Sequence, residues 1–182
     1  RGLGIPLTVG GGVRTTAHAG DLLDAGADKV GINSAAVADP ALLTRISERF
    51  GAQCCILSLD AARRDDADGW EVVVRSGKER TGRDAVAWAR EAVDRGAGEI
   101  LLTSWDRDGT RSGYDLDLLR AVCTTVRVPV IASGGAASAE HLADALEAGA
   151  AAVLAASIFH DGDLTVRDVK QSLAARGLPV RP

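Results

Sequence analysis

The chain has 182 residues, a length that suits one domain with a substantial core. Its 46% hydrophobic and 25% charged residues are typical of a folded globular protein. A formal net charge of -4 excludes a generally basic surface, so we do not expect nucleic acid as a partner. No apolar run approaches the ~20 residues of a membrane span and no signal peptide leads the chain, so we expect neither membrane insertion nor secretion.

The three cysteines are Cys54, Cys55 and Cys123. The neighbours Cys54 and Cys55 cannot easily pair with each other, and no Cys/His spacing typical of a metal site occurs. We therefore expect the three cysteines to be small buried apolar side chains of a protein in a reducing, cytoplasmic setting. Neither a metal nor a redox cofactor is predicted.

Short apolar runs alternate with longer amphipathic stretches along the chain. The apolar runs are predicted strands, at 5–9, 29–32, 54–59, 99–103, 128–132 and 152–155. The amphipathic stretches are predicted helices, at 17–25, 40–50, 84–95, 115–125, 138–148 and 165–176. Strands that are apolar throughout and separated by helices indicate a parallel sheet covered by helices. Asp39 is the predicted N-cap before Pro40, and left-handed residues are expected after four helices, at Gly26, Gly51, Gly96 and Gly149.

Two insertions interrupt this alternation. Residues 65–83 combine a polar turn at 65–69 with a β-like run at 70–74, which predicts a hairpin on the loop after the third strand. Residues 104–115 are too many and too polar for a plain connector. Both insertions follow the carboxyl ends of predicted strands, where a (βα) barrel carries its functional residues.

A shift of 123 residues lays the chain over itself without a gap. The matched pairs are Pro6 with Pro129, Gly11 with Gly134, Gly12 with Gly135, 25–27 with 148–150, Val30 with Val153, and Ser34 with Ser157. One register serves all of these pairs, across two strands and the helix between them. We interpret residues 5–37 and 128–160 as an internal half-barrel repeat.

Each copy of the repeat has a chemistry that suits phosphate. One strand ends in a glycine pair and the next ends in a serine, which follows the first glycine by 23 residues in both copies. Glycines let backbone N–H groups approach an anion, and the start of the following helix adds partial positive charge. Glycines needed only for tight turns are the alternative reading. The two predicted cradles are Gly11-Gly12 with Asn33-Ser34, and Gly134-Gly135 with Ala156-Ser157.

Segments spread along essentially the whole length of the chain resemble the cyclase subunits of imidazole glycerol phosphate synthase, which act in histidine biosynthesis. These segments are 6–12, 27–37, 96–104, 106–110, 112–115, 131–135 and 155–160. The resemblance implies a (βα)8 TIM-type barrel, here one domain over 1–182 that holds about six βα units and lacks the first two strands.

The resemblance also implies a reaction and a partner. Ammonia would convert a bisphosphorylated ribulosyl-formimino aminoimidazole carboxamide ribonucleotide to imidazole glycerol phosphate and aminoimidazole carboxamide ribotide. A glutaminase subunit, in a heterodimer with the cyclase, would supply the ammonia at the opposite end of the barrel. The alternatives are the sister phosphoribosyl-formimino isomerase of the same pathway, which shares the cradles, and an inactive phosphate-binding barrel fragment.

Asp60 ends the third apolar run, where a carboxylate either points into the barrel mouth or solvates a turn; the end of a buried strand favours the first reading. By resemblance it is one of two catalytic aspartates that act as general acid and base. The other aspartate would belong to a strand that precedes Arg1. The resemblance also assigns Asp108 and Gly109 to the second phosphate cradle, where Asp108 is expected to bind a ribose hydroxyl or to order backbone amides.

Four polar residues at strand ends complete the predicted site. Thr103 and Ser133, at carboxyl ends, are expected either to bind the substrate or to be satisfied core hydroxyls. Lys29 and Glu99 begin strands and therefore face the opposite mouth, where charges usually serve stability. The resemblance implies that this charged pair forms the gate through which ammonia enters.

Overall fold

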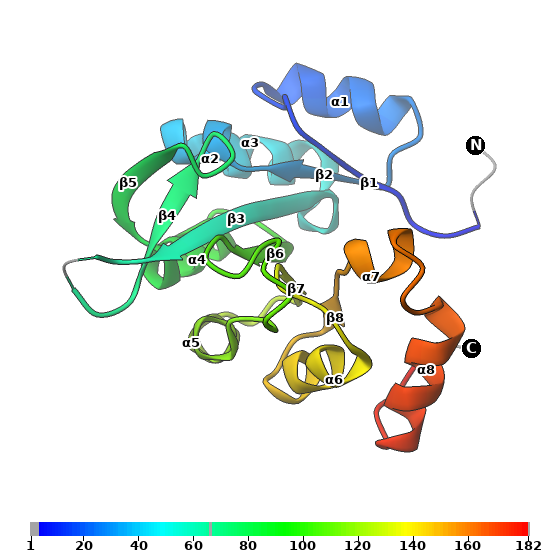
Figure 1. The fold of residues 1–182 in the computed structure, drawn as a ribbon. Helices are drawn as coiled ribbons and strands as arrows, with labels where there is room; N and C mark the ends of the chain where they lie inside the picture. Colours follow the sequence, from blue (N-terminus) through cyan, green and yellow to red (C-terminus); the bar gives the residue numbers. More distant parts are fainter. Residues whose placement is uncertain (1–3, 66, 182) are drawn as a thin grey trace.

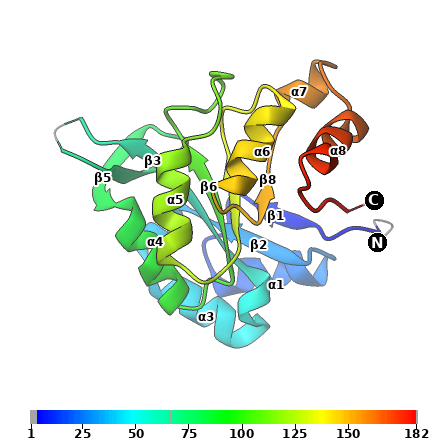
Figure 2. The same ribbon diagram turned by 90° about the horizontal axis from the view of Figure 1, so that it is seen from below.

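The computed structural model describes residues 4–65 and 67–181. The predicted domain over 1–182 also includes residues 1–3, 66 and 182, which lie outside the described residues. Six strands form a parallel sheet in the order β1-β2-β3-β6-β7-β8. The sheet curls with the helices on its outer side, as in a partial (βα)8 barrel (Figures 1 and 2). Its strands are β1 (Thr8–Gly10), β2 (Lys29–Ile32), β3 (Cys55–Arg63), β6 (Glu99–Ser104), β7 (Val130–Ser133) and β8 (Ala152–Val153).

Helices connect successive strands, and each predicted helix is present within one residue of its predicted bounds. These are α1 (Thr16–Asp24), α3 (Ala41–Phe50), α4 (Ala85–Asp94), α5 (Leu116–Thr125), α6 (Ala139–Glu147) and α8 (Val166–Ala175). Three short elements were not predicted, because they span too few residues for a helical period to show. They are α2 (Ser34–Ala38), the 3-10 turn η1 (Ala52–Cys54) and α7 (Ser157–His160). None of the described helices is long and apolar enough to cross a membrane.

The starts of most helices are set by side-chain caps. The side chain before the first turn accepts a backbone N–H at Thr15, Asp84, Asp115, Ser138 and Thr165. The prediction that Asp39 caps a helix is wrong. Pro40 is the N-cap of α3 and no side chain caps it. Asp39 instead closes the end of α2 through its backbone N–H, and its carboxylate accepts a hydrogen bond of 2.6 Å from Arg45.

The predicted hairpin after the third strand is confirmed. β3 is longer than expected and runs past Asp60 to Arg63, where it pairs antiparallel with β4 (Trp70–Val74), which pairs in turn with β5 (Glu79–Asp84). Asp60 therefore lies inside a strand, with Val73 of β4 on one side and Thr103 of β6 on the other. Pairing on both sides fixes the backbone that carries this carboxylate.

The side chains of β3 alternate between two faces of the sheet. Leu57 and Leu59 are fully buried in the core that the outer helices cover, together with Leu43 of α3. Ser58 and Asp60 point the other way and are half-buried on the inner face. The inner face at the carboxyl end of the sheet is therefore where polar side chains collect.

Candidate functional site

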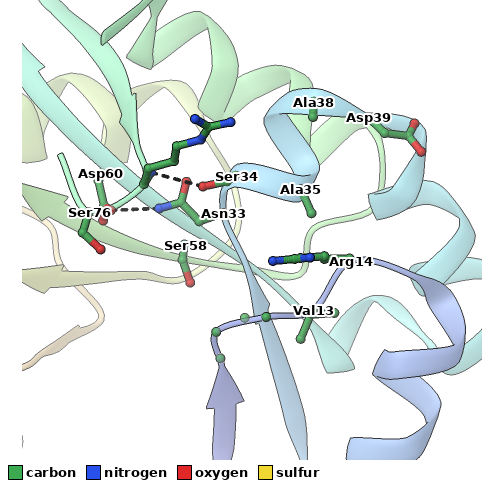
Figure 3. Close-up of a pocket in the computed structure, with 15 residues that line it drawn as sticks. Val13, Arg14, Asn33, Ser34, Ala35, Ala38, Asp39, Ser58, Asp60 and Ser76 are labelled. Atoms are coloured by element: carbon green, nitrogen blue, oxygen red, sulfur yellow. Dashed lines mark hydrogen bonds between the residues drawn. The ribbon is translucent and has the colours of Figure 1, made fainter. Parts of the chain in front are cut away.

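Two pockets open at the carboxyl ends of the strands, one at each of the segments that match at a shift of 123 residues. The first, here the Gly11 pocket, has a volume of about 950 Å³ and lies at the ends of β1, β2 and β3, beside the hairpin (Figure 3). The second, the Gly134 pocket, has a volume of about 180 Å³ and lies at the ends of β7 and β8. The predicted residues Gly11, Gly12, Asn33, Ser34 and Asp60 line the first pocket. The second is lined by Asp108, Gly109, Ser133, Gly134, Gly135, Ala156 and Ser157.

Both glycines of each pair have a positive φ. φ is 92° at Gly11 and 93° at Gly134, and it is 75° at Gly12 and 97° at Gly135. These positive values lie in the region that glycine adopts without a steric cost. Both pockets thus have a glycine pair with positive φ at positions that match at a shift of 123 residues.

The surroundings of the glycine pairs differ. A Cβ on Gly135 would overlap the carbonyl oxygen of Gly113, whose N–H donates a hydrogen bond of 2.8 Å to the Gly135 carbonyl. A Cβ on Gly11 or Gly12 would meet no described atom within 4 Å. The β6–α5 loop thus packs tightly over the Gly134 pocket, whereas the Gly11 pocket is open, in line with their different volumes.

Each pocket has a serine in the first turn of a short helix. Ser34 begins α2 and Ser157 begins α7. The residues before them, Asn33 and Ala156, have similar φ values of -119° and -123°. The first amides of a helix have no partner within it, so each pocket can offer an anion both a hydroxyl and backbone N–H groups.

The carboxyl group of Asp60 faces the Gly11 pocket and accepts a hydrogen bond of 2.8 Å from the side-chain amide of Asn33 (Figure 3). Burial raises the pKa of Asp60 above the usual value for an aspartate. The hydrogen bond from Asn33 opposes this rise, the charge of Asp108 adds to it, and a hydrogen bond from Thr103 opposes it. A carboxyl group with a raised pKa is suited to general acid and base chemistry near neutral pH.

A row of polar side chains joins the two pockets. Asp60 is in register with Thr103 of β6, and Thr103 is in register with Ser133 of β7. Residues in register on parallel strands point to the same face, and all three are half-buried. The row begins at the Gly11 pocket, which Asp60 lines, and ends at the Gly134 pocket, which Ser133 lines.

Comparison with known proteins shows the family of the chain. The family model described as "Histidine biosynthesis protein" matches residues 1–165. The chain belongs to the histidine biosynthesis protein family. It is also 57% identical over 177 residues to the imidazole glycerol phosphate synthase subunit HisF of Gluconacetobacter diazotrophicus, an alignment that covers 97% of this chain and 68% of that protein.

In this histidine biosynthesis protein, Lys29 and Glu99 form an ion pair with 2.6 Å between Nζ and Oε2. The two residues begin β2 and β6, so the pair lies at the end of the sheet opposite the pockets. The side chain of Glu99 is only 14% exposed and that of Lys29 is 29% exposed. The two predicted residues are thus brought together across β3, which lies between their strands.

The sequence did not identify several residues that line the pockets of this histidine biosynthesis protein. Arg14 lies just beyond the Gly11-Gly12 pair, but its match in the second copy is Ala137, so the self-comparison gave no signal there. Arg75 and Ser76 reach the Gly11 pocket only because the hairpin folds back over it. The remaining unpredicted polar residues are Asp39 and Ser58 in the Gly11 pocket and Arg111 in the Gly134 pocket.

The cysteines are only partly as expected. Cys55 is buried, and burial raises the pKa of its thiol to about 12, so this group stays protonated. Cys54 and Cys123 are half-buried rather than buried, because the first lies in η1 and the second near the end of α5. Within residues 4–65 and 67–181, no group of three or more His, Cys, Asp or Glu side chains could hold a metal ion.

Proposed function

We propose that this protein is the cyclase subunit of imidazole glycerol phosphate synthase and carries out the ammonia-dependent cyclase step of histidine biosynthesis. The observation that carries the proposal is the half-buried Asp60, which stands in a polar row between two glycine-lined pockets. The 57% identical relative is named as a subunit of that synthase, which supports the same function here and does not favour the isomerase.

The substrate is a ribonucleotide with a phosphate group at each end. One phosphate binds in the Gly11 pocket, to backbone amides of the glycine loop and to the hydroxyl of Ser34. The other binds in the Gly134 pocket, where Ser157 supplies the hydroxyl. Asp108 carries a negative charge and so faces a ribose hydroxyl or backbone amides rather than the phosphate. Two anchored ends fix the reacting centre beside the row of Asp60, Thr103 and Ser133.

Asp60 moves protons during the reaction. In the first step the nitrogen of ammonia adds to the ribulosyl carbonyl carbon and loses protons, and the carbonyl oxygen leaves as water. In the second step the same nitrogen bonds to the formimino carbon, whose bond to the aminoimidazole nitrogen breaks, and this leaving nitrogen gains a proton. The Asp60 carboxylate accepts a proton in the first step and, once protonated, donates one in the second. Burial raises the pKa of Asp60 above the usual aspartate value, which makes the protonated form that the second step needs easier to reach.

The Lys29–Glu99 pair marks the entrance for ammonia, at the end of the sheet opposite the pockets. The relative's name, a synthase subunit, supports a partner chain, and we propose a glutaminase docked at this end. Replacing Lys29 by Met should lower turnover driven by glutamine and the partner more than turnover driven by added ammonia. An equal loss in both assays would argue against an entrance at this pair.

The test of the function is turnover with ammonium salt at high pH, where free ammonia is abundant, without any glutaminase. We expect imidazole glycerol phosphate and aminoimidazole carboxamide ribotide to form together, at a rate that rises with ammonia concentration. An isomerase would act on its substrate at a rate independent of ammonia. Ligand binding without any turnover would leave only a phosphate-binding protein.

A further inference from the structure

The tip of the β4–β5 hairpin forms one wall of the Gly11 pocket, through Arg75 and Ser76. The backbone N–H of Arg75 donates a hydrogen bond of 3.3 Å to Ser34 Oγ, the hydroxyl proposed to bind phosphate (Figure 3). We infer that Arg75 is a further substrate-binding residue, whose guanidinium binds the phosphate group held in the Gly11 pocket. The inference rests on the proposed function, because it requires that this pocket binds a phosphate.

The backbone of the tip points to a binding role. Among the described residues, the non-glycine residues with positive φ are Arg75, Ser76 and Arg111, at 55°, 57° and 60°. All three line one of the two pockets. A side chain in this left-handed region costs roughly 1–2 kcal/mol per residue, and such residues collect at ligand sites. A hairpin turn with asparagine and glycine would avoid most of this cost, so a tip made of arginine and serine favours a function for their side chains.

The tip is also held in position from its far side. Gly77 follows with φ of 74°, and a Cβ there would overlap the ring of Trp105. Trp105 comes directly after β6, in the loop whose residues Asp108 and Gly109 line the Gly134 pocket. The hairpin tip thus lies between the hydroxyl of Ser34 and the ring of Trp105, which keeps Arg75 at the rim of the pocket.

The charge of Arg75 is available to a ligand. Its guanidinium pairs with Glu79 at 3.3 Å, but the two side chains are 76% and 50% exposed. Exposed pairs of this kind contribute little, so a phosphate with two negative charges can compete for the arginine. In the other pocket Arg111 is tied to two carboxylates, those of Asp161 and Asp163. Arg75 has a single exposed partner, so it can exchange that partner for a phosphate more readily than Arg111 can.

The Gly11 pocket offers a second cation across from the tip. Arg14 extends into the pocket in Figure 3 and makes no ion pair or side-chain hydrogen bond with the rest of the described chain. Of the two acidic residues that line the pocket, Asp39 is already bound to Arg45, and burial raises the pKa of Asp60. The pocket therefore favours an anion, and the exposed Arg75 is among the residues that line it.

The test is a titration with inorganic phosphate, followed through the backbone amides in a ¹H–¹⁵N NMR spectrum at constant ionic strength. Gly11 and Gly12 report one pocket, and Gly134 and Gly135 report the other, in the same sample. Arg75→Gln should weaken binding at Gly11 and Gly12 by roughly tenfold, the effect of losing a charge-assisted contact. Binding at Gly134 and Gly135 should stay within about twofold of the parent, because Arg75 does not line that pocket.

A matched control distinguishes the effect of a direct contact between Arg75 and phosphate from the effect of losing one positive charge on the hairpin tip. Lys78 is exposed on the same tip but does not line the pocket, so Lys78→Gln removes the same charge and should leave phosphate binding nearly unchanged. Gly77→Ala keeps every charge but pushes the tip off Trp105, and it should also weaken binding at Gly11 and Gly12. Equal weakening by Arg75→Gln and Lys78→Gln would overturn the inference.

The remaining outcomes distinguish this inference from the proposed function. In one outcome, phosphate shifts the Gly11 and Gly12 signals with the same affinity in the parent and in Arg75→Gln. Arg75 then does not bind the phosphate, and the pocket still does. In the other outcome, phosphate shifts neither glycine pair in the parent. The proposal that the two pockets bind phosphate is then wrong, and so is the role of Arg75.

Discussion

The side-chain amide of Asn33 donates a hydrogen bond of 2.8 Å to the Asp60 carboxylate, from the end of β2 to the neighbouring strand β3. The other end of the amide, Oδ1, is buried and has no hydrogen-bond partner among the described residues. Asp60 therefore sets the orientation of the Asn33 side chain. A residue proposed to bind phosphate and the proposed acid–base residue are in direct contact.

Removing this contact should change the pH dependence of the reaction. In Asn33→Ala the carboxylate loses a donor that lowers its pKa, so the pKa of Asp60 should rise further. Since the carboxylate form accepts the proton, the acidic limb of the kcat/KM profile should move to higher pH. The measurement is the ammonia-dependent rate across the pH range. Ser34→Ala, which removes a neighbouring hydroxyl in the same pocket, should weaken binding without moving that limb; an unmoved limb in Asn33→Ala would contradict the account.

The raised pKa of Asp60 also predicts how stability depends on pH. Between the pKa of the unfolded chain, about 3.9, and the higher pKa of the folded protein, the folded state holds more protons. The free energy of unfolding therefore falls as pH rises through this window. Asp60→Asn has no carboxylate to ionise, so it should be more stable than the parent at about pH 8 and lose that advantage as pH falls toward 4. Urea unfolding at several pH values measures this, and a pH-independent difference would count against it.

The two glycine loops should tolerate a methyl group differently. Alanine at Gly12 or at Gly135 would have to adopt a positive φ, which lowers the free energy of unfolding by about 1–2 kcal/mol in either case. At Gly135 the new Cβ would also overlap the Gly113 carbonyl, whereas at Gly12 it would meet open space. We expect Gly135→Ala to lower the free energy of unfolding clearly more than Gly12→Ala does. Equal losses in urea unfolding would show that the β6–α5 loop does not pack as described.

The hairpin is anchored to α5 through Asp115. This carboxylate caps the helix by accepting the N–H of Leu118 at 3.0 Å, and it also accepts the indole N–H of Trp70 at 2.9 Å. Asp115→Ala should cost about 2 kcal/mol, roughly 1 for the cap and roughly 1 for the second bond. Trp70→Phe should cost about 1 kcal/mol through the lost bond, and the double variant should cost less than the sum of the two. Strict additivity would mean that the bond contributes nothing.

The helices of this protein could be predicted closely because their signals are local. Ser138 and Thr165 cap helices whose apolar faces repeat with the helical period, so sequence neighbours alone define those elements. Asp39 shows the limit of such signals. An unpredicted short helix ends just before it and uses its backbone, so the carboxylate turns to Arg45 instead of capping α3.

The candidate site was only partly predictable for a related reason. Glycine pairs and serines at a fixed spacing are a sequence pattern, and they line the pockets as expected. The contact of Asn33 with Asp60 depends on the register of β2 against β3, which no local pattern specifies. The place of Arg75 depends on how a hairpin folds back over the sheet, and that is decided by packing against Trp105.

The most direct test of the account compares turnover and binding in one variant, Asp60→Asn, which keeps the size of the side chain and removes only its acid–base function. We predict that ammonia-dependent turnover falls by at least about a hundredfold, the usual effect of losing a general acid or base. The affinity for the bisphosphate substrate should stay within about threefold of the parent, because the glycine pairs and the serine hydroxyls proposed to bind the two phosphates are unchanged. Turnover close to that of the parent would contradict the role of Asp60 between the two phosphate pockets.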